Sequence, residues 1–213
     1  MIKWVIFDVG ETLIKERRAW DEWADWINVP RIEFWAELEK VIAERQHHQV
    51  VFERFRPGFD VEAARAERSA AGQIDQLQTS DLYVDARSTI KSLAARQIGV
   101  GVAGNQPASS AEFFSDLEWP IDLIGMSGDS GIAKPAPIFF DKLIELTGLA
   151  PDQLAYVGDR IDNDVLPAQR AGMHGIFLRR GPWGKAHAEW PEAQGLPYVI
   201  DNLTEILGLD LLQ

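Results

Sequence analysis

The chain of 213 residues contains no cysteine, which excludes disulfide bonds, thiolate metal sites and cysteine nucleophiles. Basic residues are also scarce, because 21 Lys and Arg face 33 Asp and Glu and leave a formal net charge of −12. A field of this sign opposes binding to a phosphate backbone, so no nucleic-acid partner is expected. No apolar run approaches the roughly 18 residues of a membrane span, so no membrane association is expected either.

The first ten residues, MIKWVIFDVG, contain an apolar run that is too short for the core of a signal peptide and that meets an acid at Asp8. This segment is therefore interpreted as a buried strand. Together with the lack of cysteine, it leads us to expect a cytoplasmic protein. The sequence does not fix the oligomeric state, for which a monomer or a homodimer is expected.

Short apolar runs rich in β-forming residues recur along the chain and are separated by helical patterns. The expected strands are Trp4–Phe7, Ile98–Ala103, Ile121–Ile124, Leu154–Val157, His174–Leu178 and Tyr198–Ile200. Helical patterns include Asp85–Arg96 and Ala136–Leu146. This alternation predicts an α/β fold, a doubly wound, Rossmann-like parallel sheet covered by helices on both faces.

The long gap after the first strand has no strand pattern and predicts an inserted helical module. We expect the core domain to comprise residues 1–14 and 81–213, and the insert to comprise residues 15–80. Its expected helices run from Glu16 to Ile27, from Arg31 to His47 and from Val61 to Ala71. Tryptophans crowd the first part of the insert, where they favour a small buried core over a substrate-facing or dimer-forming surface.

Polar residues follow three of the expected strands. Asp8, Asn105 and Asp159 each come after an apolar run, and the carboxyl ends of parallel strands form the crevice where ligands bind. Two carboxylates at neighbouring strand ends repel each other, so a hard cation such as Mg²⁺ is expected between them. Lys134, just before a helix that a proline starts, can point its ammonium into the same crevice.

Four motifs, in this order and spacing, resemble those of the haloacid dehalogenase-like superfamily over almost the whole chain. They are FDVGETL, VGVAGNQ, GIAKPAPIFF and YVGDRIDNDVLPAQRAG. The first motif alone is weak, whereas the lysine motif and the G-D-x-x-x-N-D pattern are specific. The resemblance implies that the insert is the small helical cap of that family.

The resemblance implies a nucleophile and a metal site. Asp8 would be the nucleophile that forms an aspartyl intermediate, and Thr12 would support the loop that follows it. Magnesium would be held by the carboxylates of Asp8 and Asp159 and by the backbone carbonyl of Gly10.

The remaining motif residues would handle the phosphoryl group. By the same resemblance, Asn105 would hold that group through its side-chain amide, and Lys134 would neutralise charge on the group and on Asp8. Asp164 would orient Lys134 or a water bound to the metal.

The sequence departs from the family pattern at two glycines. Phosphatases of the family usually carry an acid–base aspartate where Gly10 stands, and adjacent Glu11 is an uncertain substitute. A serine or threonine is usual where Gly104 stands, so one hydroxyl contact to the phosphoryl group is missing. Loss of general acid–base help typically costs about 10²–10⁴-fold in rate.

Three functions remain open at this stage. The first is a magnesium-dependent phosphatase that acts on a small phosphorylated metabolite through an aspartyl-phosphate, slowed by the glycine at position 10. The second is a weak or inactive regulatory protein that binds metal and phosphate. The third is a 2-haloacid dehalogenase, which the acidic fourth motif disfavours because such dehalogenases need no metal.

Overall fold

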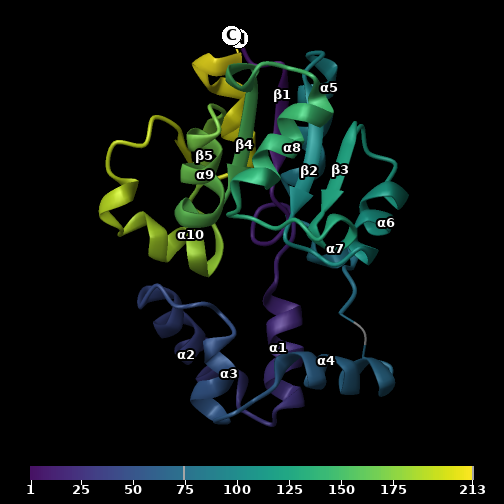
Figure 1. Ribbon diagram of the computed structural model, residues 1–213, viewed down its shortest axis with the longest axis vertical. Helices are drawn as coiled ribbons and strands as arrows, with labels where there is room; N and C mark the ends of the chain where they lie inside the picture. Colours follow the sequence, from purple (N-terminus) through teal and green to yellow (C-terminus); the bar gives the residue numbers. More distant parts are fainter. Residues whose placement is uncertain (74, 213) are drawn as a thin grey trace. The chain divides into compact units, whose positions relative to one another are not determined.

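The structure is a computed structural model that describes residues 1–73 and 75–212. Six parallel strands form one sheet in the order β3-β2-β1-β4-β5-β6 (Figure 1). The strands are β1 (Trp4–Phe7), β2 (Gly99–Gly104), β3 (Leu123–Met126), β4 (Leu154–Gly158), β5 (His174–Leu178) and β6 (Val199–Ile200). Because the strand order reverses between β1 and β4, the predicted doubly wound, Rossmann-like α/β class is confirmed.

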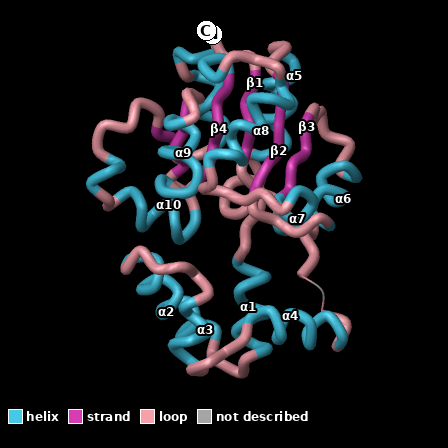
Figure 2. Tube along the Cα trace, in the orientation of Figure 1, coloured by secondary structure: helices cyan, strands magenta, loops and turns pink. Residues whose placement is uncertain are grey.

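Helices follow the strands and cover the sheet, as the tube in Figure 2 shows. In the part of the chain that carries the sheet they are α5 (Ala86–Ala95), α6 (Ser109–Asp116), α7 (Ser127–Ser130), α8 (Pro137–Thr147), α9 (Leu166–Arg170) and α10 (Gly181–Ala188). A π-helical turn, η3 (Ile161–Val165), leads into α9. Among the described residues, none of the helices has the length and apolar character needed to cross a membrane.

The two faces of the sheet bury separate apolar layers because successive side chains of a strand point to opposite sides. Val5 and Phe7 of β1 join a cluster with Ile90 and Leu93 of α5. Ile6, between them, joins the opposite cluster. The other buried side chains of that second cluster come from β2, β4, the helices α8 and α9 and the turn before β5: Ala103, Phe139, Phe140, Leu143, Leu154, Tyr156, Ala168 and Met173.

The chain divides into two compact units. One comprises Met1–Lys15 and Leu77–Gln213, and the other comprises Glu16–Gln76. The second, inserted unit contains α1 (Arg17–Trp26), α2 (Arg31–Ala43), α3 (Val50–Phe55) and α4 (Val61–Ala70). Its core is aromatic, since the buried ring of Phe52 lies 5.1 Å from Trp23 and 5.8 Å from Phe34 between ring centroids.

The two connections between the units are joined on the sheet-bearing side. The amide of Lys15 donates to the carbonyl of Asp81 at 2.8 Å, and the amide of Tyr83 donates to the carbonyl of Leu13 at 2.9 Å. Between these bonds, Ile14 and Leu82 form an antiparallel bridge. We call this short pairing of residues 13–15 with residues 81–83 the neck.

One helix of the inserted unit is shorter than predicted. The pattern from Arg31 suggested a helix to His47, but α2 ends at Ala43. Arg45 adopts a left-handed φ of 58°, and the amide of Gln46 donates back to the carbonyl of Val41 at 3.0 Å, which closes the helix end. The chain then turns and starts α3 (Val50–Phe55), a helix that was not predicted from the sequence.

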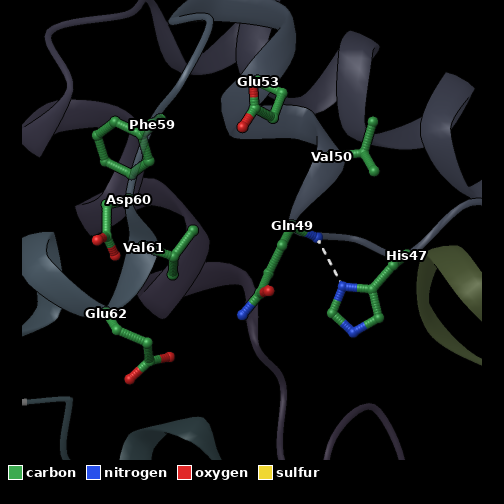
Figure 3. A pocket seen from close by; sticks show the side chains of 8 residues that line it. All are labelled: His47, Gln49, Val50, Glu53, Phe59, Asp60, Val61 and Glu62. Carbon is green, nitrogen blue, oxygen red and sulfur yellow. Dashed lines mark hydrogen bonds between the residues drawn. The ribbon is translucent and has the colours of Figure 1, made fainter.

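A shallow cavity of about 400 Å³ lies within the inserted unit (Figure 3). Its lining includes three acids, Glu53, Asp60 and Glu62. Two of these acids accept hydrogen bonds from backbone amides: Glu53 from Gly58 at 2.9 Å, and Asp60, which caps α4, from Ala63 at 3.0 Å. The acidic lining makes this cavity unsuitable for a phosphate group.

We expect Phe140→Ala to lower the free energy of unfolding by about 3–5 kcal/mol, the usual cost of truncating a buried aromatic side chain. Phe140 is fully buried and its ring packs edge-on against Tyr156 at 5.3 Å. Ile138→Ala on the same helix is the control, because Ile138 is 55% exposed and its truncation should change stability by about 0.5 kcal/mol or less. Urea unfolding followed by circular dichroism measures both, and equal losses would contradict this packing.

Candidate active site

The acids of the first and fourth motifs meet where the strand order reverses. Asp8 follows β1 and Asp159 follows β4, and these neighbouring strands are in register at Phe7 and Val157. Ligands of open α/β sheets bind at this switch point, outside the carboxyl ends of the strands. The fold therefore brings together two carboxylates that lie 151 residues apart in the sequence.

The ammonium of Lys134 lies between two carboxylates. Its Nζ donates to Oδ1 of Asp8 at 2.5 Å and to Oδ1 of Asp164 at 2.6 Å, and its side chain is only 1% exposed. Burial alone would lower the pKa of Lys134, but the charges of Asp164 and Asp8 outweigh it and raise this pKa well above the ordinary value. The lysine is therefore a permanent cation in the site.

Tyr156 of β4 lies beside this lysine. Its ring centroid is 5.4 Å from Nζ of Lys134, and its hydroxyl donates to the carbonyl of Ala103 at 2.7 Å. Burial raises the pKa of Tyr156, so the hydroxyl stays protonated. Tyr156 was not among the predicted site residues, because a tyrosine within a buried strand carries no signal beyond packing.

Asp164 is fully satisfied by its neighbours. Oδ1 accepts from Lys134, and Oδ2 accepts from the backbone amide of Arg160 at 2.9 Å. Burial raises the pKa of Asp164 to about 6, against the opposing effect of the Lys134 ammonium. The carboxylate is thus placed to orient Lys134, which is one of the two roles that the resemblance implied.

Asp159 is in the opposite situation. It is 2% exposed, and its Oδ2 has no hydrogen-bond partner among the residues that the structure describes. Burial, followed by the charges of Asp164 and Asp8, raises the pKa of Asp159 well above its ordinary value. A buried carboxylate without a donor is costly unless a cation approaches it.

The donor set fits a hard divalent cation. One carboxylate oxygen from each of Asp8, Asp159 and Asp164 lies within 4.8 Å of the others. The ammonium of Lys134 contacts Asp8 and Asp164, and Asp164 already uses both oxygens for hydrogen bonds. The carboxylates of Asp8 and Asp159 are therefore the ones left to share a cation, and oxygen ligands of this kind suit Mg²⁺.

Asn105 contacts the backbone of the lysine motif. Its Nδ2 donates to the carbonyl of Lys134 at 2.9 Å, and its Oδ1 accepts from the amide of Lys134 at 2.8 Å. This reciprocal pair was not among the roles that the motifs implied. It fixes the segment that carries the buried ammonium, while the second N–H of the amide is left for another acceptor.

Two glycines make room for the site carboxylates. A β-carbon on Gly104 would lie 2.6 Å from Oδ1 of Asp8, and one on Gly158 would collide with the side chain of Asp164. Since real β-carbons do not approach other atoms this closely, a serine or threonine at position 104 would require Asp8 to move. The lost hydroxyl contact at Gly104 is thus coupled to the observed position of the nucleophile candidate.

The loop after Asp8 is folded tightly onto one carbonyl. Val9 O accepts from the amides of Thr12, Leu13 and Ile14 at 3.3, 2.9 and 2.9 Å. Gly10, half-buried, forms a bridge with Ile14. The hydroxyl of Thr12 is buried without a hydrogen-bond partner among the described residues, so the contacts of Thr12 within the loop are made by its backbone.

The two arginines after β5 have different environments. Arg179 pairs with Asp201 at 2.7 Å on the surface. Arg180 is largely buried, donates to the carbonyl of Thr12 at 3.0 Å and pairs with Asp85. Neither arginine was among the predicted site residues, and two consecutive arginines at a strand end give no sign of which one turns inward.

Comparison with known proteins places this geometry in a family. The family model of haloacid dehalogenase-like hydrolases matches residues 2–172. A Danio rerio relative, haloacid dehalogenase-like hydrolase domain-containing protein 3, is 24% identical and covers 96% of this chain and 95% of its own length. Glyceraldehyde 3-phosphate phosphatase of Pyrococcus furiosus is 27% identical over 65% of this chain and 60% of its own length.

Solved structures support the same fold. The haloacid dehalogenase-like hydrolase YfnB of Bacillus subtilis, in a form bound to magnesium, has a TM-score of 0.69 at 16% identity and covers 97% of both chains. A 2-haloacid dehalogenase of Pseudomonas syringae has a TM-score of 0.59 at 22% identity and covers 98% of this chain and 97% of its own. The chain therefore belongs to the haloacid dehalogenase-like hydrolase family and is a hydrolase of the phosphatase-like type.

Proposed function

We propose that this hydrolase is a magnesium-dependent phosphatase that acts on a small phosphorylated metabolite through an aspartyl-phosphate on Asp8. The observation that carries the proposal is that the three site acids differ in their hydrogen-bond partners. Lys134 holds Asp8 and Asp164, whereas Asp159 brings to the same cluster a buried oxygen to which no described residue donates. Such an acidic cluster stabilises an added cation, and that cation in turn stabilises the anionic phosphoryl group of the substrate.

The first chemical step belongs to Asp8. Its carboxylate attacks phosphorus, an O–P bond to Asp8 forms, and the bond to the leaving oxygen breaks. Covalent trapping divides one hard displacement into two easier ones. Lys134 contacts Asp8 and offsets charge on the phosphoryl oxygens, and Asn105 keeps Lys134 in place and offers its remaining N–H to the group.

The second step releases phosphate. Water attacks phosphorus, the O–P bond to Asp8 breaks, and the water loses a proton. The carboxylates of Asp8 and Asp159 and the carbonyl of Gly10 would hold Mg²⁺, which when bound offsets charge on the phosphoryl oxygens. The inserted unit Glu16–Gln76 would act as the cap that selects the substrate.

Both steps need a proton carrier that position 10 does not supply. The leaving oxygen must gain a proton in the first step, and water must lose one in the second, so Gly10 should slow both. This feature also favours the second candidate, a weak or inactive protein that binds metal and phosphate in a regulatory role. The dehalogenase alternative is weaker, because in a metal-free reaction no described residue would partner the buried Asp159 oxygen.

A screen of phosphorylated metabolites with and without Mg²⁺ tests the proposed function. We expect phosphate release that requires Mg²⁺ and is absent in Asp8→Asn, measured by a malachite green assay. Chloride release from 2-chloro acids, equally fast with and without Mg²⁺, would instead support the dehalogenase. Binding of Mg²⁺ and phosphate by calorimetry without any turnover would support the regulatory candidate.

Rapid-quench assays with an activated aryl phosphate should show a burst close to one product per active site, followed by slow turnover. An aryl leaving group does not need the first proton, whereas hydrolysis of the aspartyl-phosphate still lacks its base. Gly10→Asp should raise the rate of the slow phase. Acid–base catalysis typically gives about 10²–10⁴-fold, and we expect part of this gain because the new carboxylate lacks supporting contacts. Fast wild-type turnover of alkyl phosphates, with no burst, would show that another group carries the proton.

Asp159→Asn should stabilise the metal-free protein at pH 8. The folded-state pKa of Asp159 lies above its ordinary value of 3.8, so the folded protein binds the extra proton and Asp159 costs stability as pH rises through that interval. Asparagine removes this cost, and we expect a gain of about 1 kcal/mol or more, or roughly 2–4 °C in Tm. The gain should shrink as pH falls toward 4.

Magnesium should make the wild type more stable than Asp159→Asn, the reverse of the order expected without the metal. It should raise the Tm of the wild type and have little effect on Asp159→Asn, because a neutral amide cannot balance the ion's charge. Asp162→Asn is the control, since that side chain is 44% exposed and pairs with Arg160 at 3.0 Å. Differential scanning calorimetry from pH 4 to 8 measures all three proteins, and an Asp159→Asn that is less stable than the wild type at pH 8 would argue against a cation site here.

A further inference from the structure

Glu11 is a buried acid to which the proposed chemistry assigns no role. It is 4% exposed and stands directly after Gly10 in the loop that follows Asp8. Its φ of 49° lies in the left-handed region, which a residue other than glycine adopts only when its surroundings hold it there. The contacts of the side chain should therefore explain why glutamate occupies this position.

The side chain of Glu11 contacts Tyr83 and the backbone at Gly181. The hydroxyl of Tyr83 donates to Oε2 at 2.5 Å, a short hydrogen bond typical of a charged acceptor. On another side, a β-carbon built on Gly181 would lie 2.5 Å from Oε2 and 2.7 Å from Cγ of Glu11. The carboxylate thus packs against the backbone at the start of α10, where only glycine leaves enough room.

Tyr83 is itself held from both ends. Its amide donates to the carbonyl of Leu13 in the neck, and the guanidinium of Arg180 lies 4.0 Å from its ring centroid. Arg180 also donates to the carbonyl of Thr12 and pairs with Asp85. Glu11, Tyr83 and Arg180 therefore form a chain of contacts that starts and ends in the loop after Asp8.

The hydrogen bond between Tyr83 and Glu11 persists at ordinary pH. Burial, together with the neighbouring Glu11 carboxylate, raises the pKa of Tyr83 above its usual range, so the phenol remains a donor. The acceptor oxygen of Glu11 is thereby occupied throughout the range in which the enzyme would work.

We propose that Glu11 is a positioning residue that locks the loop from Val9 to Ile14 through Tyr83 and Gly181, and that it does not replace the acid–base group missing at Gly10. The lock fixes the direction of the Gly10 carbonyl and of the backbone next to Asp8. This inference rests on the proposed function only for its activity readout, because the loop geometry also governs Mg²⁺ binding.

Three substitutions separate positioning from proton transfer. Glu11→Gln keeps the size of the side chain and an oxygen that can accept from Tyr83, but it cannot exchange a proton at ordinary pH. Glu11→Gly removes the contacts while favouring the left-handed backbone, so a loss in this variant cannot come from backbone strain. Tyr83→Phe removes one hydroxyl and leaves Glu11 in place.

We expect Glu11→Gln to retain kcat on an activated aryl phosphate within about threefold, and Glu11→Gly and Tyr83→Phe to lose about tenfold or more in kcat with a smaller change in KM. Calorimetry should show Mg²⁺ affinity unchanged in Glu11→Gln and weakened about tenfold in the other two, as for other groups that orient metal ligands. An acid–base role would instead make Glu11→Gln lose about 10²–10⁴-fold in kcat with its Mg²⁺ affinity intact. That result, or wild-type Mg²⁺ affinity in Tyr83→Phe, would overturn the proposal.

The adjacent arginines supply a matched control. Arg180→Met should behave like Tyr83→Phe, whereas Arg179→Met should match the wild type, because Arg179 pairs with Asp201 on the surface. Circular dichroism identifies any variant that fails to fold. If one does, the comparison is decided by Tyr83→Phe, which removes a single hydroxyl and changes the side chain least. If the wild type releases no phosphate, the proposed function fails, and the Mg²⁺ affinities of the same variants still decide whether Glu11 positions the loop.

Discussion

The buried ammonium of Lys134 is the interaction on which the rest of the site depends. A cation without water is stable only beside acids, and Asp8 and Asp164 supply two of them within 2.6 Å. The surrounding structure serves this arrangement. Asn105 fixes the backbone of the lysine, Gly104 and Gly158 leave room for the carboxylates, and the π-helical turn after β4 directs Asp164 inward. The third acid, Asp159, exceeds what one lysine can balance, and this excess is what calls for a metal ion.

The fold could be predicted from the sequence because its signals are local. Apolar runs bounded by turn residues gave all six strands, and the alternation with helices gave the parallel sheet. Boundaries shifted where local signals were weak. The third strand begins at Leu123 instead of Ile121, and α2 ends at Ala43 because a left-handed Arg45 closes it, a conformation that no residue type in that stretch announces. The six-residue helix α3 (Val50–Phe55) was not predicted at all, because it is too short for a clear helical pattern.

The site residues that directly follow strands could be predicted from the sequence. Asp8, Asn105 and Asp159 follow β1, β2 and β4 in the order that the motifs imply, and Lys134 was expected to point its ammonium into the same crevice. The supporting contacts could not be foreseen in the same way. Tyr83 and Arg180 reach the nucleophile loop from segments about 70 and 170 residues away, and nothing in their local sequence distinguishes them from surface residues. The amide of Asn105 likewise contacts a backbone segment that the motif spacing does not reveal.

The neck, in which residues 13–15 pair with residues 81–83, has a consequence for how the sequence of this chain can evolve. Its two segments are paired by backbone hydrogen bonds, and these bonds do not depend on the side chains of the 61 residues from Glu16 to Gln76. Both ends of the insertion are therefore held close together whatever lies between them. Insertions, deletions and even replacement of the whole helical segment can accumulate beyond Lys15 while the loop that carries Asp8 keeps its shape. The neck thus lets one part of the chain diversify at little cost to the other.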